Sequence, residues 1–371
     1  MTKALHFLDY FSSSYTELRE KFLYTAGQAG ANVDSFANPA PGPDAETLYT
    51  DVARLGTKNA RKVLVLVSGT HGVEGYSGSG CQNGWLVEQG GQSLPEDTAV
   101  VLVHLLNPYG VAWQRRQNEN NVDVNRNFIK HDNQMRPNPD YDQVHDLLVL
   151  PSLDHITVAN AERALADFIL ARGEEAYGRA VTAQYQHPDG LFYGGEEESW
   201  SNRILHQVLS EHCSNTEHVA FIDFHSGMGP FGYGMLLSPY NLHQADSARA
   251  KNWFGDSMIS LIQTDARLDE ETVAQMYTSC TMDAVIRALP DKTVTALTLE
   301  FGTYPFDQCV PLMREDAWLY KNGDPLNEQG MDIRRRWLEV FYPATPDWLE
   351  MVWWRSQQII RQAIVGLAAS G

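Results

Sequence analysis

Cysteine, positive charge and long apolar runs are all scarce in this 371-residue sequence. The four cysteines lie far apart, at Cys81, Cys213, Cys280 and Cys309, which indicates reduced thiols rather than a disulfide framework. Lysine and arginine number 28 against 47 acidic residues, and the net charge of −19 argues against a nucleic-acid partner or an anionic membrane surface. No apolar run reaches the length that spans a bilayer.

The first 22 residues, MTKALHFLDYFSSSYTELREKF, have no basic segment followed by an apolar core, which argues against a secretory signal. We therefore expect a cytoplasmic protein. No repeat or low-complexity tract is present. A hydrophobic content of 43% is ample for one continuous core, so we expect residues 1–371 to form a single domain. Helical patterns around 130–200 suggest an insertion in it.

Strand-like and helical patterns alternate along the chain. Strands are predicted at 62–69, 98–105, 218–223, 234–238 and 293–300. Helices are predicted at 12–28, 75–90, 158–180, 199–213, 245–263 and 346–368, with Ser199 capping the fourth, and 129–142 is predicted to be a loop. This alternation predicts an α/β fold with a mixed, mostly parallel sheet flanked by helices.

A histidine and a glutamate three residues apart follow the first predicted strand. His71 and Glu74 come after the apolar run KVLVLVSG, at the sheet edge where open α/β sheets gather their ligands. A spacing of three places both side chains on one side of a helical turn, so they can converge on one ion. Because the sequence has 12 histidines and many acids, on the order of one such pair is expected by chance.

A second histidine strengthens the metal hypothesis. His225 is predicted to lie just past the end of the buried strand VAFID, which runs into glycines. The alternative is a hydrogen-bonded core histidine. Together with His71 and Glu74 it would complete a set of three protein ligands with a fourth position for water, the pattern of catalytic zinc.

An acidic residue inside a third apolar strand could supply a base. Glu300 lies in the run VTALTLEFG, where a charged side chain is costly unless it is paired or used chemically. A buried salt bridge is the alternative. A carboxylate beside a metal-bound water can accept its proton, and we assign Glu300 that role.

These residues resemble, in order, the motifs of the zinc carboxypeptidase family, the carboxypeptidase A-like or funnelin enzymes. H-x-x-E corresponds to His71 and Glu74, the later histidine to His225, and E-x-G to Glu300 and Gly302. NPYG at 107–110 resembles the Asn-Pro-Asp-Gly of the family, with tyrosine in place of aspartate. The resemblance implies a zinc-carboxypeptidase-like fold and one zinc ion per chain.

The segment VDVNRNF extends the resemblance. Asn125 and Arg126 match the pair that binds the terminal carboxylate of the substrate, and Asp123 matches the acid that hydrogen-bonds the first ligand histidine. Arg116, nine residues before Asn125, is preferred over Arg115 as the arginine that polarises the scissile carbonyl. A polar, solvated loop is the alternative for this segment.

The family also uses a mobile tyrosine. Tyr277 lies 23 residues before Glu300, about where that tyrosine falls, and Tyr233 and Tyr240 are alternatives.

The sequence thus predicts a zinc hydrolase that cleaves an amide bond next to a free carboxylate, most simply a carboxypeptidase acting on peptides. A deacylase of N-acyl amino acids resembling aspartoacylase and succinylglutamate desuccinylase is the first alternative, because of the short spacing around Arg116. A non-catalytic zinc-binding protein is the second. The sequence indicates neither an oligomeric state nor a side-chain preference.

Overall fold

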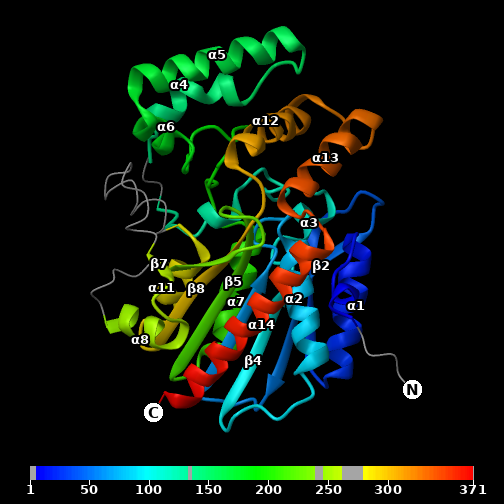
Figure 1. The fold of residues 1–371 in the computed structure, drawn as a ribbon, viewed down its shortest axis with the longest axis vertical. Coiled ribbons are helices and arrows are strands. Elements are labelled where there is room, and N and C mark those ends of the chain that lie inside the picture. The colour runs from blue at the N-terminus through cyan, green and yellow to red at the C-terminus, as the bar shows by residue number, and fades with distance from the viewer. Residues whose placement is uncertain (1–5, 133–135, 239–244, 261–278, 371) are drawn as a thin grey trace.

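The structure is a computed structural model that describes residues 6–132, 136–238, 245–260 and 279–370. Its centre is an eight-stranded sheet with the strand order β1-β2-β4-β3-β5-β8-β6-β7 (Figure 1). In chain order the strands are β1 Asn32–Pro41, β2 Thr47–Gly56, β3 Lys62–Ser68, β4 Thr98–His104, β5 His218–Gly227, β6 Gly234–Ser238, β7 Met258–Ser260 and β8 Thr293–Gly302.

The four central strands, β4, β3, β5 and β8, run parallel to one another. The outer pairs β1–β2, β2–β4 and β6–β8 are antiparallel, and β6–β7 is parallel. The predicted α/β fold with a mixed, mostly parallel sheet is therefore confirmed. Because parallel strands end at one edge, the residues that follow β3 and those that close β5 and β8 come together in space.

Helices cover the sheet and extend beyond its carboxyl edge (Figure 1). The helical elements are η1 Phe7–Tyr10, α1 Tyr15–Gln28, α2 Gly75–Glu88, α3 Pro108–Ala112, η2 Val124–Arg126, α4 Pro139–Leu148, α5 His155–Arg172, α6 Glu174–Ala180, α7 Trp200–Cys213, α8 Ala245–Phe254, α11 Thr281–Ala288, α12 Phe306–Asn322, α13 Glu328–Phe341 and α14 Pro346–Ala369. Within the described residues, no helix combines the length and the apolar character that a membrane span requires.

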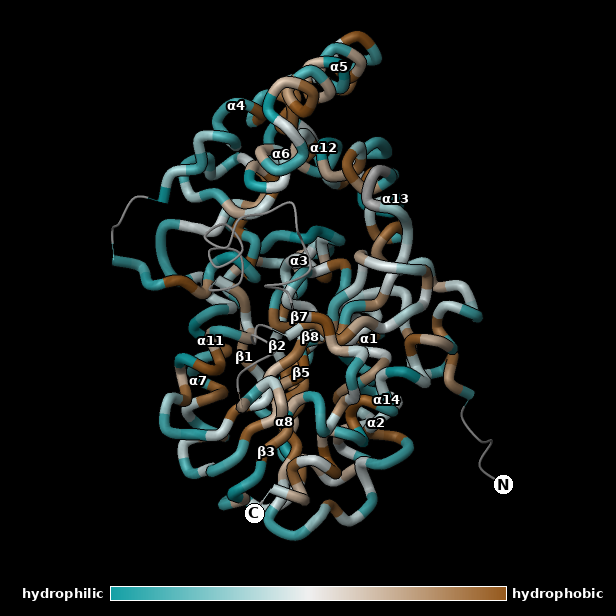
Figure 2. The backbone as a smooth tube through the Cα atoms, turned by 60° about the vertical axis from the view of Figure 1, so that its left-hand side comes forward, coloured by the Kyte–Doolittle hydropathy of each residue, from teal (hydrophilic) through white to brown (hydrophobic). Residues whose placement is uncertain are grey.

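Alternation along the strands divides the core into two clusters. In β3, Leu64 and Leu66 join the cluster that contains α1, α2 and α14 residues, whereas Val63, Val65 and Val67 join the cluster that contains α7 and α11 residues. Figure 2 shows the central strands as predominantly hydrophobic segments inside more hydrophilic outer turns. Each fully buried aliphatic side chain contributes about 1.5–3 kcal/mol, so both helix layers are firmly attached to the sheet.

A third apolar cluster lies beyond the carboxyl edge of the sheet, among α4, α5, α6, α12 and α13. It contains Leu165 of α5, Leu312 of α12 and Trp337 of α13, together with Val73 from the turn between His71 and Glu74. The described part of the 130–200 stretch thus contains three helices that pack on α12 and α13 (Figure 1). Both the single domain and the insertion stay predictions.

Several element boundaries differ from the sequence prediction. The strand predicted at 218–223 continues to Gly227, so His225 lies within β5 rather than past its end. The helix predicted at 245–263 ends at Phe254, because Gly255 adopts a φ of +90° and a short strand follows. The sequence analysis missed β1, β2, α12 and α13, whose segments contain prolines or several charged residues. Ser199 caps α7 as predicted, accepting from the amide of Asn202.

Candidate metal centre

Three strands place the predicted ligands and the predicted base at one edge of the sheet. His71 lies three residues beyond the end of β3, and Glu74 is the residue that precedes α2. His225 of β5 and Glu300 of β8 are direct partners in the parallel register. Both share their face of the sheet with Phe221 and Ala296, because side chains alternate along a strand.

Three side chains converge closely enough to hold one ion. One potential ligand atom from each of His71, Glu74 and His225 lies within 4.8 Å of the others. The two carboxylate oxygens of Glu74 face different rings, since Oε1 is 2.8 Å from His71 Nδ1 and Oε2 is 2.8 Å from His225 Nδ1. All three residues are buried, with 3% exposure or less. The predicted ligands therefore come together, although their role in binding a metal stays a prediction.

The far nitrogen of each imidazole faces a second carboxylate. His71 Nε2 is 3.1 Å from Asp123 Oδ1, and His225 Nε2 is 2.8 Å from Asp223 Oδ2. A neutral ring that donates from Nε2 to an aspartate directs the lone pair of Nδ1 toward Glu74, where a cation would lie. Two such nitrogens and a carboxylate form a donor set that suits zinc, so the residues present fit the ion.

Asp223 was missed by the sequence analysis. It is fully buried in β5 two residues before His225, and its carboxylate also accepts from the hydroxyls of Thr70 at 2.9 Å and Thr281 at 2.6 Å. An acid inside the apolar strand VAFID is the same signal that singled out Glu300, and it could have been found in that way. Asp223 fixes the orientation of the second histidine as Asp123 fixes that of the first.

The electrostatic balance of the centre favours a cation. Burial opposes ionisation of Glu74, but the charges on His71 and His225 hold the pKa of this carboxyl well below its usual value. Burial also opposes ionisation of the His225 imidazole, yet Asp223 and Glu74 raise its pKa well above its usual value. Carboxylates outnumber guanidinium groups here, so in the absence of a metal ion a proton on His225 replaces part of its charge.

The two neighbouring arginines have different partners. Arg116 points into the centre, where its Nε donates to Asp123 Oδ2 at 3.0 Å and its Nη1 donates to Glu74 Oε1 at 3.3 Å. Arg115 instead forms a buried ion pair with Asp316 of α12 at 2.9 Å. The structure thus brings Arg116, the preferred residue, to the site and directs Arg115 elsewhere.

The Asn-Pro turn positions this arginine segment. The side chain of Asn107 accepts from the amide of Gly110 at 2.9 Å at the start of α3 and donates to the carbonyl of Arg116 at 3.3 Å. The same carbonyl accepts from the amide of Gly72, next to His71, at 3.2 Å. The Asn-Pro turn is therefore intact with tyrosine in place of aspartate. Hydrogen bonds through the Arg116 carbonyl connect this turn to the ligand loop, the segment from His71 to Glu74.

Glu300 is buried beside the convergent residues but is not one of them. Its Oε1 accepts from the amide of Met228 at 3.0 Å. Burial and the nearby carboxylate of Glu74 raise the pKa of Glu300 to about 7. A carboxyl with this pKa can exchange a proton near neutral pH, as a general base requires.

Asn125 and Arg126 lie on the neighbouring segment η2, half-buried. Asn125 accepts from the amide of Thr281 at 3.0 Å. Arg126 donates to the carbonyls of Thr182 at 2.7 Å and Asn125 at 3.0 Å, and it forms no ion pair with a described residue. The guanidinium is therefore held in place by neutral groups and keeps its charge for an anionic ligand.

The tyrosine assignment cannot be followed in the structure. Tyr277 and Tyr240 lie outside the described residues. Tyr233 precedes β6, is 49% exposed, and its carbonyl accepts from the amide of Gly302 at 3.1 Å.

A family model described as "Protein of unknown function (DUF2817)" matches residues 11–355. The chain belongs to the DUF2817 family. None of the curated proteins that were compared with it matches this DUF2817 chain.

Solved structures identify the fold. Carboxypeptidase A from Helicoverpa armigera is similar with a TM-score of 0.50 and 12% identity, over 97% of this chain and 74% of that one. Bovine thrombin-activatable fibrinolysis inhibitor is similar with a TM-score of 0.48 and 11% identity, over 96% of this chain and 97% of that one. The succinylglutamate desuccinylase from Chromobacterium violaceum is similar with a TM-score of 0.39 and 14% identity, over 83% of this chain and 74% of that one. On the strength of the first match, the fold is that of the zinc carboxypeptidases.

Proposed function

We propose that this DUF2817 protein is a zinc-dependent hydrolase that cleaves an amide or peptide bond next to a free carboxylate. The observation that carries the proposal is the convergence of His71, Glu74 and His225 beside Glu300, a buried acid that is not among them. Metal hydrolysis needs both parts, ligands that hold the ion and a base that the ion does not occupy. A divalent cation bound there would lower the pKa of water and polarise a carbonyl group.

Glu300 moves the proton in this mechanism. As a carboxylate it accepts the proton of the attacking water, and as an acid it passes the proton to the nitrogen of the leaving amine. In the metal-free protein its pKa is raised to about 7, so both forms are accessible near neutral pH. The bond from the amide of Met228 holds the carboxylate in place.

Arg116 supports the charge that develops on the carbonyl oxygen. Its Nε and Nη1 are bound to Asp123 and Glu74, which fixes the plane of the guanidinium. Among the described residues, Nη2 has no hydrogen-bond partner and can donate to the oxyanion. A donor fixed in advance stabilises the transition state without reorganising.

Arg126 selects the substrate. A fixed guanidinium with no anionic partner among the described residues suits the free carboxylate next to the scissile bond. Loss of that carboxylate would leave the guanidinium unpaired in the complex, so the amide of the same substrate is disfavoured.

Removal of an acyl group from an N-acyl amino acid is the second candidate. The nine residues that separate Arg116 from Asn125 favour it, because this short spacing resembles the compact sites of such deacylases. Both reactions use the same ligands and the same base, so the substrate distinguishes them.

The test compares rates on a blocked dipeptide, its C-terminal amide and an N-acetyl amino acid, with and without a chelator. We expect chelation to abolish hydrolysis, the dipeptide acid to be preferred, and Arg126→Ala to remove most of that preference. Arg116→Ala should lower turnover on every substrate that the protein cleaves. Equal rates on acid and amide would contradict the exopeptidase function, and cleavage of the N-acetyl amino acid alone would establish the deacylase. A zinc-loaded protein that cleaves none of them would favour the non-catalytic alternative.

A further inference from the structure

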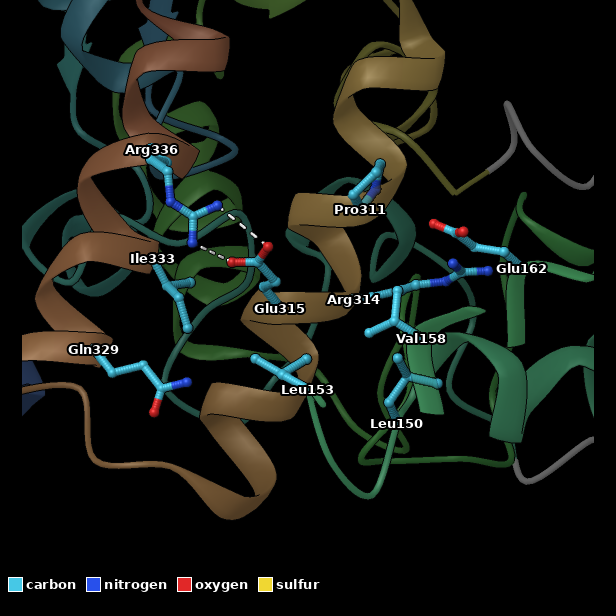
Figure 3. Close-up of a pocket in the computed structure, with 10 residues that line it drawn as sticks. All are labelled: Leu150, Leu153, Val158, Glu162, Pro311, Arg314, Glu315, Gln329, Ile333 and Arg336. Carbon is cyan, nitrogen blue, oxygen red and sulfur yellow. Dashed lines mark hydrogen bonds and ion pairs between the residues drawn. The ribbon is translucent and has the colours of Figure 1, made fainter. Parts of the chain in front are cut away.

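A pocket lies among α5, α12 and α13, and its lining shares no residue with the candidate metal centre (Figure 3). Its volume is about 240 Å³. At roughly 30 Å³ per liquid water molecule, this is room for a small organic molecule rather than a single water. Leu150, Leu153, Val158 and Ile333 give it an apolar wall.

A buried guanidinium lines this pocket, and two of its nitrogens lack a hydrogen-bond partner in the described part of the chain. Arg314 of α12 is only 3% exposed, and its Nε and Nη2 are buried atoms with no hydrogen-bond partner among the described residues. Arginine stays charged in proteins, and buried charges are nearly always paired. A guanidinium whose Nε and Nη2 face a cavity without acceptors can therefore bind an anion that accepts from both, for which a carboxylate is the matching shape.

The other charged groups of the lining narrow the choice of anion. Arg336 and Glu315 bind each other, and Arg336 also binds Asp332 at 2.8 Å, so these groups satisfy one another. Glu162 of α5 lies on the Arg314 side of the pocket (Figure 3). Its negative charge opposes the lowering that burial imposes on the pKa of Arg314, but no ion pair joins the two within the described residues. Two acids on the lining disfavour a dianion such as phosphate. A carboxylate on Arg314 with a cationic group toward Glu162 would satisfy both.

We propose that this pocket binds a free α-amino acid with an apolar side chain. Its carboxylate forms a bidentate ion pair with Arg314, and its ammonium group lies toward Glu162. Its side chain packs on Leu150, Leu153 and Val158. This site is separate from the catalytic proposal, because none of these residues belongs to the metal centre.

The experiment measures binding of leucine by calorimetry, with leucinamide and 4-methylpentanoate as the probes that lack the carboxylate or the ammonium group. An amino acid is also a product of the proposed reaction, so the titrations use Arg126→Ala protein, in which the product carboxylate has lost its partner. We expect leucine to bind this protein with one site per chain, and each of the two other probes to bind at least about tenfold more weakly, the scale of one charge-assisted interaction.

Variants locate the site. In the same background, Arg314→Met should weaken leucine binding at least about tenfold. Glu162→Gln, at an exposed position that can change without disturbing the fold, should weaken leucine but not 4-methylpentanoate. Arg335→Met, which removes an arginine with a 63% exposed side chain on α13, is the matched control and should change nothing.

Three results would overturn the proposal. These are the absence of leucine binding at millimolar concentration in folded Arg126→Ala protein, equal binding of leucine and 4-methylpentanoate, and unchanged binding in both Arg314→Met and Glu162→Gln. Failure of the hydrolysis assay would not affect any of these measurements, so the two proposals can fail separately.

Discussion

At the scale of residues, the centre is organised by paired carboxylates around two imidazoles. Each ring meets Glu74 through Nδ1 and an aspartate through Nε2, Asp123 for His71 and Asp223 for His225. Such partners fix the tautomer and the orientation of a ring, which is a large part of what makes a metal site selective. Glu300 differs from Glu74, because its carboxylate accepts from the backbone amide of Met228 and not from a histidine.

Replacing Glu300 by glutamine should separate chemistry from metal binding. The amide keeps the shape of the side chain but cannot accept the proton of water, so turnover should fall by about three orders of magnitude, the scale of a lost general base. Zinc content, measured by elemental analysis, should stay at about one ion per chain. Loss of zinc would make Glu300 a ligand, and near-normal turnover would remove it from the mechanism.

Replacing Asp223 by asparagine should weaken zinc binding without unfolding the protein. His225 loses the acceptor that fixes its tautomer, and the zinc affinity should fall about 10–100-fold, as for other partners of metal-bound histidines. Competition with a chromophoric chelator measures the affinity, and the unfolding midpoint of the metal-free variant is the control. An unchanged affinity would show that Asp223 merely fills space.

At the scale of elements, strand register decides which side chains meet. His225 and Glu300 are opposite each other because β5 and β8 pair from His218 and Thr293 onward without a shift. A slip of one residue would carry Glu300 to the face occupied by Leu299 and Phe301. Beyond the sheet, α12 is tied to the arginine segment through Asp316 and Arg115.

Asp316→Asn should therefore destabilise the fold. Arg115 is 7% exposed and would be left as a buried charge without its carboxylate, which costs about 3–5 kcal/mol of unfolding free energy. Urea titration measures this change. Asp332→Asn, which breaks exposed ion pairs on α13, is the matched control and should change the stability by no more than about 1 kcal/mol. If the two substitutions lowered the unfolding free energy equally, the buried pair would be no more important for stability than an exposed pair.

At the scale of the whole molecule, the ligand loop lies where the sheet meets the outer helices. Val73, between His71 and Glu74, is fully buried in the same cluster as Trp337 and Phe341 of α13. The carbonyl of Phe341 also accepts from the hydroxyl of Ser226, next to His225, at 2.7 Å. Metal binding should consequently stabilise the contact between the sheet and α13, and not the segment from His71 to Glu74 alone.

Removal of the metal should lower the melting temperature, and more so at high pH than at low pH. A ligand that binds only the folded protein stabilises it by mass action. In the metal-free protein the pKa of His225 is raised, so its protonation stabilises the fold at low pH, and this contribution is lost as the pH rises through the raised pKa.

Zinc must displace that proton, so its affinity rises with pH as the stabilisation from protonation is lost. Calorimetric scans with and without a chelator, from pH 5.5 to 8.5 as a rough working range around the ordinary histidine pKa, measure the difference. A pH-independent difference would exclude His225 as a ligand that competes with protons.

The sequence by itself determined the parallel core of the sheet and named the three side chains that converge in the candidate centre. Long valine- and leucine-rich runs define buried strands whatever surrounds them, and His71, Glu74 and Glu300 stand out as polar residues at strand ends or inside strands. By the same criterion Asp223 could have been found. The helix α13 could also have been found, because Ile333, Trp337 and Phe341 recur at helical spacing. The edge hairpin β1–β2 and the helix α12 are harder to find, because prolines or charged residues interrupt their apolar patterns and they are stabilised by what they pack against.

Only the tertiary structure decided which partners these residues have. Arg115 and Arg116 are neighbours in the chain, yet Arg115 pairs with Asp316 of α12 and Arg116 pairs with Glu74 of the candidate metal centre. The pairing of His225 with Glu300 depends on strand register, and the pocket at Arg314 depends on helices that are adjacent only after folding. Local sequence fixes which chemical groups are present and which backbone geometry is favoured. Distances between groups far apart in the chain follow from packing, which no local pattern encodes.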